Sequence, residues 1–308
     1  MYRYLRNESI ELEHRHLEEI TATFPDLAQE KVIFKDDGLV YDLLIINNSY
    51  VFRFPKYDWS IDDMFRESAC LQLAGRYCGI QIPEWQIHDD RFVSYRKIMG
   101  HALTEHEFNN LDPEVKETVY RELGTFLKSL HGIPKRELKE HDIKDSMTRH
   151  DYNDWMKLYD DVQQELYRNM TASARDAVDA LFRVIIADYS FAEFSPRLIH
   201  GDLGDYHILF DSAEGKLSGI IDFSSSGLGD PATDIACLLL QYGEAFVGAL
   251  QPYYRNITKL IDRARFIAGT LPLQWALGGV RTGDNSWFLV HLGKRGSIYP
   301  IGSPLSAG

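Results

Sequence analysis

The sequence predicts an α+β protein with two unequal lobes, a small antiparallel β-sheet lobe followed by a larger, mostly helical lobe. Short apolar runs separated by turn residues dominate the first 98 residues, and one helical pattern interrupts them. Strongly amphipathic helical patterns dominate after Gly100. With 308 residues, the chain is long enough to bury a sizeable core. We therefore expect lobes at residues 1–98 and 99–308.

The N-terminal lobe is expected to contain five strands and one inserted helix. A first helix, which precedes these strands, is expected to run to about Phe24. Ser9 can cap its N-terminus, because a Ser side chain accepts hydrogen bonds from the free N–H groups of the first turn. Turn residues at 36–38 and 47–49 separate the first three strands, which predicts an antiparallel meander. The expected strands are 31–35, 39–46, 50–54, 85–88 and 91–98, with the inserted helix at 61–77.

The C-terminal lobe is expected to be helical around three short strands. Pro113 stands in the first turn of an amphipathic helix that Gly132 and Pro134 end. Residues 135–150 are polar and are expected to form loops, with helices at 152–168 and 173–189 and again from Pro231. The strands between these helices are expected at 197–200, 207–210 and 217–221.

Composition excludes several classes of partner. The 33 Lys and Arg residues against 46 Asp and Glu give a formal net charge of −13, whereas a nucleic-acid backbone requires clustered cations. No apolar run approaches the roughly 18 residues of a membrane span, and the N-terminus is charged instead of apolar. Three cysteines without CxxC spacing are typical of a reducing compartment. We expect a cytoplasmic monomer that binds a small molecule and neither nucleic acid nor membrane.

The segment from Leu198 to Phe210, LIHGDLGDYHILF, carries the most chemical information. An apolar strand leads into His-Gly-Asp, a second begins at His207, and Asp222 ends another short strand twelve residues after Phe210. Such groups at neighbouring strand ends suit phosphoryl transfer, in which one carboxylate deprotonates a hydroxyl and another holds Mg²⁺ against the phosphates. Asp202 and His207 are five residues apart, the separation of base and metal ligand in the kinase catalytic loop.

The stretches LIHGDLGDYHILF and GIIDFSSSGLGDPATDIACLL resemble the aminoglycoside phosphotransferase family, a branch of the protein-kinase-like fold. The 2″-aminoglycoside and macrolide 2′-phosphotransferases likewise place His five residues after the catalytic Asp. The resemblance implies a two-lobe kinase-like fold with Asp202 as catalytic base and with His207 and Asp222 as Mg²⁺ ligands. It also implies structural support from His200 and from Asp230, which matches a position that braces the catalytic loop.

The resemblance further implies nucleotide contacts in the N-terminal lobe. By register, Arg53 takes the place where many kinases have Lys, with Glu67 as its partner on the inserted helix. Lys56 is the competing candidate for the phosphates, but positions 53 and 56 of a strand face opposite sides. Gly38 is the one glycine between the first two strands, and Ile98 is expected to offer backbone groups to the nucleotide base. The implied cofactors are Mg²⁺ and either ATP or GTP.

The leading hypothesis is a phosphotransferase that acts on a hydroxyl of an aminoglycoside. Acidic side chains would suit such a polycation, and the candidate substrate residues are Glu244, Asp205 and Trp275. A macrolide phosphotransferase is the alternative, because an apolar acceptor suits the aromatic residues Trp275, Trp287 and Phe288. A kinase of an ordinary metabolite is a further alternative. A kinase-like binding protein without catalysis usually lacks the base or the metal ligand, and both are present here.

Overall fold

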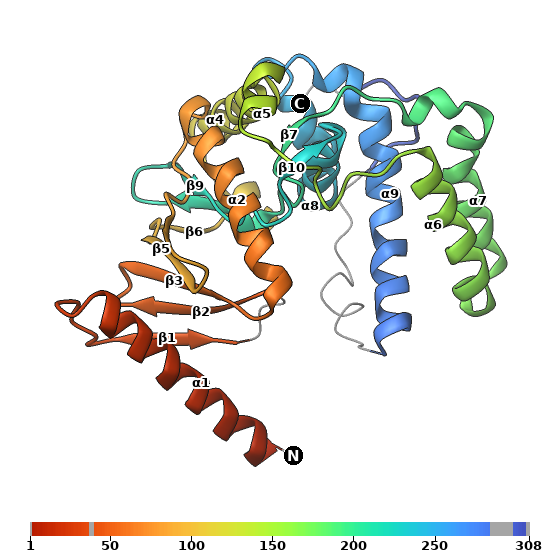
Figure 1. The fold of residues 1–308 in the computed structure, drawn as a ribbon. Coiled ribbons are helices and arrows are strands. Elements are labelled where there is room, and N and C mark those ends of the chain that lie inside the picture. Colours follow the sequence, from red (N-terminus) through yellow and green to blue (C-terminus); the bar gives the residue numbers. More distant parts are fainter. Residues whose placement is uncertain (1, 37–39, 284–297, 306–308) are drawn as a thin grey trace.

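The computed structural model describes residues 2–36, 40–283 and 298–305. A five-stranded antiparallel sheet in the order β1-β2-β3-β5-β4 forms the N-terminal lobe, as predicted (Figure 1). Its strands are β1 (Val32–Lys35), β2 (Tyr41–Ile46), β3 (Tyr50–Pro55), β4 (Gln86–His88) and β5 (Phe92–Arg96). Two helices accompany the sheet, α1 (Tyr2–Thr23) and the inserted helix α2 (Asp58–Tyr77).

The two faces of this sheet pack against different helices. The face toward α1 is strongly apolar, and its buried residues are Leu44, Ile46, Phe52, Phe54 and Phe92, packed with Ile20. On the opposite face, Tyr41 and Val93 pack with Met64 of α2. Since successive strand residues point to opposite faces, β3 directs Arg53 away from α1 and toward α2.

Two helix boundaries in this lobe differ from the predictions. Helix α1 begins at Tyr2, so Ser9 lies within it and does not cap it. Helix α2 begins at Asp58, three residues earlier than expected, because the Ser60 hydroxyl bonds to the backbone of Tyr57 and closes the first turn there. Gly38, the expected phosphate-loop glycine, lies outside the described residues.

The C-terminal lobe holds two small sheets and most of the helices (Figure 1). The sheets have the orders β6-β8-β9 and β10-β7. Their strands are β6 (His101–Ala102), β7 (Arg197–Ile199), β8 (Ile208–Asp211), β9 (Lys216–Ile220) and β10 (Gly227–Gly229). The α-helices are α3 (Glu105–Asn109), α4 (Pro113–His131), α5 (Lys135–Glu140), α6 (Tyr152–Glu165), α7 (Ala172–Ala187), α8 (Ala232–Ala249) and α9 (Ile257–Thr282), and the 3₁₀ turns are η1 (Tyr167–Asn169), η2 (Tyr189–Ala192) and η3 (Asp205–His207).

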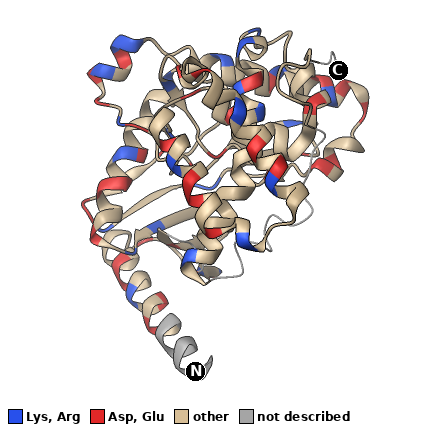
Figure 2. Cartoon of the chain, turned by 90° about the vertical axis from the view of Figure 1, so that its right-hand side faces the viewer, with Lys and Arg blue, Asp and Glu red and all other residues tan. Residues whose placement is uncertain are grey.

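Helix α4 begins at Pro113 as predicted, whereas α5 is a short helix in the stretch expected to form loops. Helix α8 is apolar on nearly every side and is accordingly buried, with α9 packed beside it. In the described part of the chain, no helix combines the length and apolarity needed to cross a bilayer. Lys and Arg are interspersed with Asp and Glu along the helices visible in Figure 2.

Candidate active site

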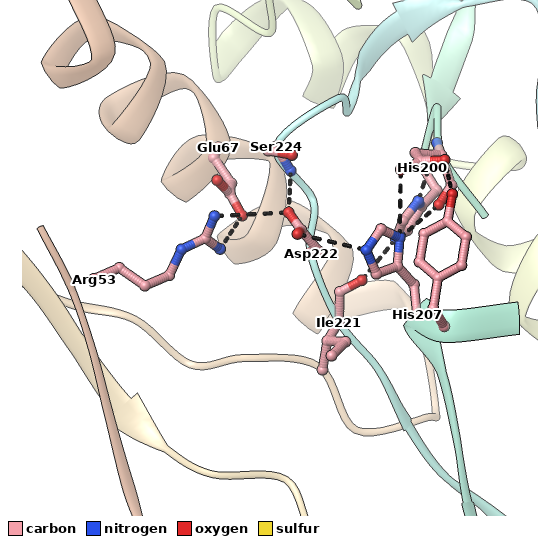
Figure 3. A network of polar contacts seen from close by, with 9 residues as sticks. Arg53, Glu67, His200, His207, Ile221, Asp222 and Ser224 are labelled. Atoms are coloured by element: carbon pink, nitrogen blue, oxygen red, sulfur yellow. Dashed lines mark hydrogen bonds and ion pairs between the residues drawn. The ribbon is translucent and has the colours of Figure 1, made fainter. Parts of the chain in front are cut away.

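The loop of residues 200–207 connects β7 to β8, and His200 fixes its shape. The His200 Nε2–H donates to the carbonyl oxygen of Ile221 at 3.0 Å, and Nδ1 accepts from the backbone N–H of Asp202 at 3.3 Å (Figure 3). Full burial lowers the pKa of His200, so the ring stays neutral with one defined tautomer. Gly201 has φ +85°, and a Cβ there would lie 2.4 Å from the carbonyl oxygen of Ser225. His200 thus links the backbone of this loop to the backbone at Ile221.

Asp234, in the first turn of α8, is the carboxylate that holds the loop. Its Oδ1 accepts from Gly201 N at 2.8 Å, and its Oδ2 accepts from His200 N at 2.9 Å. Oδ2 also lies 3.0 Å from His131 Nε2, and the other ring nitrogen of His131 contacts the Tyr254 hydroxyl. Burial alone would raise the pKa of Asp234, but the hydrogen bond and charge of His131 hold it below the usual range.

The prediction that Asp230 braces the catalytic loop is therefore wrong, because Asp234 makes that contact. Asp230 still has a structural role. Arg263 Nε and Nη2 donate to the Asp230 carboxylate at 2.7 and 3.1 Å. Asp230 also accepts from the N–H of Ala232 at the start of α8. It joins α8 to α9, and Asp234, one turn further along the chain, contacts the loop. The sequence DPATD contains both carboxylates, and no local pattern indicates which one reaches the loop N–H groups.

Asp202 lies at the open side of the loop, with 41 % of its side chain exposed. The hydroxyl of Tyr206 donates to its Oδ1 at 2.9 Å. Its backbone carbonyl accepts from His207 Nδ1 at 2.8 Å, which turns the other ring nitrogen, Nε2, toward Asp222. No sequence pattern singles out Tyr206, because a tyrosine between an Asp and a His carries no motif by itself.

Asp222 and His207, the two residues predicted to bind the metal, lie next to each other. His207 Nε2 lies 3.5 Å from Asp222 Oδ2, and Asp222 adopts φ +63°, a strained conformation for a non-glycine residue. Burial would raise the pKa of Asp222, but the His207 hydrogen bond and the Arg53 charge hold it well below the usual range. Burial would lower the pKa of His207, and Asp222 raises it overall.

The Asp222 carboxylate fits Mg²⁺, which usually binds through one or two carboxylates together with substrate phosphates. This carboxylate is ionised and lies at the cavity wall. His207 donates its Nδ1 proton to the carbonyl oxygen of Asp202, so only the neutral ring would offer its Nε2 lone pair to a cation on the Asp222 side. Within the described residues there is no preformed cluster of three or more His, Cys, Asp or Glu, and a site completed by phosphates does not require one.

Arg53 and Glu67 form a buried ion pair beside Asp222 (Figure 3). Arg53 Nη1 lies 3.0 Å from Glu67 Oε1, and Nη2 lies 3.6 Å from Asp222 Oδ1. The two residues are only 7 % and 2 % exposed. Burial opposes the charge of Arg53, but Glu67 and Asp222 outweigh it and raise its pKa. The guanidinium thus stays charged beside the Asp222 carboxylate.

Lys56 lies on the other side of the sheet, as the strand periodicity predicts. Its Nζ is 3.4 Å from Asp42 Oδ1 and also bonds to the carbonyl oxygen of Asp36. Asp42 in turn contacts His16 of α1 at 3.0 Å. Of the two candidate phosphate cations, Arg53 is therefore the one that lies beside Asp222.

A cavity of about 490 Å³ lies between the lobes and brings these groups together. Its lining includes Lys35, Tyr41, Arg53, Asp202, His207 and Asp222. Ile98 is 4 % exposed and lies in the connection between β5 and β6. Its predicted contact with the nucleotide base stays a prediction.

Glu244 is not a substrate residue, which corrects the prediction. Its carboxylate is 1 % exposed and accepts from Arg265 Nε at 2.7 Å and Nη2 at 3.1 Å. It also accepts from the N–H of Tyr299 at 3.0 Å. With both oxygens engaged, Glu244 joins α8, α9 and the C-terminal segment. Its partner lies on the next helix, 21 residues away, so no local pattern indicates the pair.

Neither of the other two predicted substrate residues, Asp205 and Trp275, is among the residues that line the cavity between the lobes. Asp205 lies in η3 and is 8 % exposed. Trp275 lies on α9, half-buried against the core of the C-terminal lobe. Trp287 and Phe288, the aromatic residues that suggested a macrolide acceptor, lie outside the described residues.

Comparison with known proteins agrees with this geometry. Residues 37–267 match the phosphotransferase enzyme family, APH. The chain belongs to this family. Viomycin phosphotransferase of Streptomyces vinaceus is 31 % identical over 177 residues, which span 56 % of this chain and 58 % of that protein. The match to this curated relative therefore covers less than two thirds of its length.

Solved structures of antibiotic phosphotransferases share the fold. The GDP and kanamycin complex of APH(2″)-IIIa is 25 % identical, covers 90 % of this chain and 96 % of that chain, and has a TM-score of 0.78. Macrolide 2′-phosphotransferase type I is 20 % identical over 94 % of this chain and 98 % of that chain, with a TM-score of 0.69. The kinase-like two-lobe fold predicted from the sequence is confirmed, and so is the resemblance to the phosphotransferase enzyme family.

Proposed function

We propose that this member of the phosphotransferase enzyme family transfers the γ-phosphate of ATP or GTP to a hydroxyl of an aminoglycoside antibiotic, with Mg²⁺ as cofactor. Residues 1–98 would bind the nucleotide, and residues 99–308 would supply the catalytic groups and the acceptor site. The observation that carries the proposal is the convergence of Asp202, His207, Asp222 and Arg53 on one cavity.

In this proposal Asp202 is the general base. The acceptor oxygen attacks the γ-phosphorus, the bond from that phosphorus to the β–γ bridging oxygen breaks, and the hydroxyl proton passes to Asp202. The loop positions this carboxylate through Asp234 and His200, which hold the backbone on its N-terminal side. A base fixed before the substrate binds loses little entropy in the reaction.

The phosphates would lie between Arg53 and the pair of Asp222 and His207. Arg53 presents a permanently charged guanidinium, oriented by Glu67. A Mg²⁺ ion bound by Asp222 and His207 would neutralise charge on the β- and γ-phosphate oxygens. Guanidinium groups pair with phosphate oxygens bidentately, so Arg53 can take the part that Lys has in many kinases.

An aminoglycoside acceptor is supported by charge and by likeness. Such acceptors are polycations, and the chain has a formal net charge of −13. The kanamycin-bound relative is 25 % identical over 90 % of the chain, more than the 20 % of the macrolide enzyme. We therefore place an aminoglycoside first and keep a macrolide or an ordinary metabolite as outcomes of the test.

The test of the chemistry combines two variants with a control. Asp202→Ala should lower kcat about 10²–10⁴-fold, the usual contribution of a general base, while nucleotide binding stays within twofold. Asp222→Ala should abolish the Mg²⁺ dependence of nucleotide binding in a calorimetric titration. Asp142→Asn, at an exposed turn with φ 49°, is the matched control and should change neither quantity. An unchanged kcat in Asp202→Ala would refute the assignment of the base.

The test of the acceptor is a substrate panel with the purified protein, Mg²⁺ and either ATP or GTP. Nucleoside diphosphate release is measured with kanamycin, gentamicin, viomycin and a macrolide, and the phosphorylated product is identified by mass spectrometry. The proposal expects transfer to an aminoglycoside. Transfer only to a sugar or amino alcohol of ordinary metabolism would reject it.

A further inference from the structure

Tyr206 contacts the proposed base directly, and no motif assigns it a part. Its hydroxyl donates to Asp202 Oδ1 at 2.9 Å, and its ring meets that of His207 edge-on, with centroids 4.4 Å apart. The side chain is 40 % exposed and lines the cavity that holds Asp202 and Asp222. The carboxylate that an acceptor hydroxyl must reach thus already accepts a hydrogen bond from another hydroxyl group.

The pose of this ring depends on a neighbouring glycine. A Cβ at Gly204 would lie 2.6 Å from the Cε1 and Cζ atoms of Tyr206, so the ring folds back over the loop only because position 204 has no side chain. Gly204 has φ −81° and ψ 166°, which other residues adopt without strain. A glycine is needed at this position because it leaves room for the Tyr206 ring, and not because the backbone adopts an unusual conformation.

The second oxygen of Asp202 is oriented differently. Oδ2 lies 3.6 Å from His207 Nδ1, on the side of the proposed metal position. Oδ1 is thus the oxygen of Asp202 that accepts a hydrogen bond from a hydroxyl group in this structure. An exposed aromatic side chain can change rotamer at small cost, so an arriving acceptor can displace the Tyr206 hydroxyl from Oδ1.

We propose that the Tyr206 hydroxyl stands in for the acceptor hydroxyl on Asp202 while the acceptor site is empty, and so suppresses transfer of the γ-phosphate to water. This inference rests on the proposed phosphotransferase function. In the suppressed reaction a water oxygen attacks the γ-phosphorus, the bond to the β–γ bridging oxygen breaks, and the water proton passes to Asp202. The products are nucleoside diphosphate and inorganic phosphate. With the Tyr206 hydroxyl bonded to Oδ1, a water molecule has to displace the phenol before it can give its proton to that oxygen.

Two variants test this inference by different routes. Tyr206→Phe keeps the ring and removes the hydroxyl, and Gly204→Ala keeps the hydroxyl and displaces the ring. In both, we expect phosphate release from ATP or GTP without acceptor to increase roughly tenfold, the factor that corresponds to a hydrogen bond of about 1.4 kcal/mol. Tyr253→Phe is the matched control, because its hydroxyl also bonds to a carboxylate, Glu117, but away from the cavity.

A binding measurement separates this role from a purely structural one. Calorimetric titration of kanamycin, with a non-hydrolysable nucleotide present, should give a lower Kd for Tyr206→Phe than for wild type, because the acceptor no longer competes with the phenol. A loss of local structure would raise that Kd. If the wild type transfers phosphate to an acceptor, and both variants hydrolyse the nucleotide at rates within twofold of the wild-type rate, this inference is overturned and the proposed function is not. Absence of transfer in the wild type with every acceptor would overturn the proposed function and this inference with it.

Discussion

Replacing Asp234 with Asn tests whether one buried carboxylate holds the 200–207 loop. Asp234 is fully buried, and its two oxygens accept from the N–H groups of Gly201 and His200 and face His131 Nε2, all within 3.0 Å. Asn has the same size, but its amide nitrogen only donates. In either orientation of the amide, an N–H group then faces an N–H group of the loop.

The expected cost follows from these contacts. A hydrogen bond to a charged group contributes about 1.5–3 kcal/mol, and removing one partner of a buried pair costs about 3–5 kcal/mol. We expect Asp234→Asn to lower the free energy of unfolding by about 3–5 kcal/mol, within the roughly 5–15 kcal/mol that domains possess. The protein should fold with reduced stability. Its kcat should also fall, because Gly201 immediately precedes Asp202.

The assay is urea denaturation followed by circular dichroism at several pH values. His131 and the loop N–H groups hold the pKa of Asp234 below its usual range, so the carboxylate contributes stability above the unfolded pKa of about 3.9. That contribution is lost as the pH falls through the native pKa, and the gap between wild type and variant should narrow below about pH 4. Asp230→Asn is the control, with a smaller expected loss of about 1.5–3 kcal/mol, because the Arg263 guanidinium is partly exposed and keeps contact with water. Stabilities of wild type and Asp234→Asn within 1 kcal/mol at pH 7 would refute the reasoning.

Three further substitutions have defined outcomes. Glu67→Gln should weaken nucleotide binding roughly tenfold in a calorimetric titration, because Arg53 loses the charged partner that orients it; equal affinity would contradict this. Glu244→Gln should lower the Tm by several degrees and leave the KM for the acceptor unchanged, because its carboxylate pairs with Arg265 inside the lobe. A raised KM at normal Tm would restore it as a substrate residue. Gly201→Ala should reduce kcat and lower the free energy of unfolding by about 1–3 kcal/mol, since the φ of +85° and the adjacent backbone exclude a Cβ. A variant with the same Tm as the wild type would argue against this.

The sequence was most informative where the chemistry depends on short-range spacing. Asp202 and His207 lie in the loop between β7 and β8, and Asp222 follows β9, which pairs with β8, so strands that are close along the chain bring the three side chains to one cavity. Strand periodicity correctly predicted that Arg53 and Lys56 lie on opposite faces of the sheet. Successive side chains of a strand alternate between the two faces, so the register of the sheet determines the face on which each residue lies. The prediction of a five-stranded sheet with one inserted helix succeeded for the same reason.

Prediction failed where a side chain finds its partner through tertiary packing. Glu244 is paired with a residue on the following helix, and the bond forms only because α8 and α9 lie side by side. The choice between Asp230 and Asp234 depends on which one faces the free N–H groups of a loop more than thirty residues away in the chain. Helix periodicity does not determine that orientation, since both residues lie at the same end of α8.

The net charge of −13 has less value as evidence for a cationic acceptor than the positions of individual carboxylates. Glu244 is neutralised by Arg265, and Asp205 is buried. The carboxylates that line the described cavity are Asp202 and Asp222, and Arg53 lies beside the second of them. A polycation would therefore meet its attractive charge chiefly at Asp202. In the proposed mechanism, attraction at Asp202 would draw the hydroxyl-bearing ring of the acceptor toward the proton acceptor, so that binding and positioning would depend on one group.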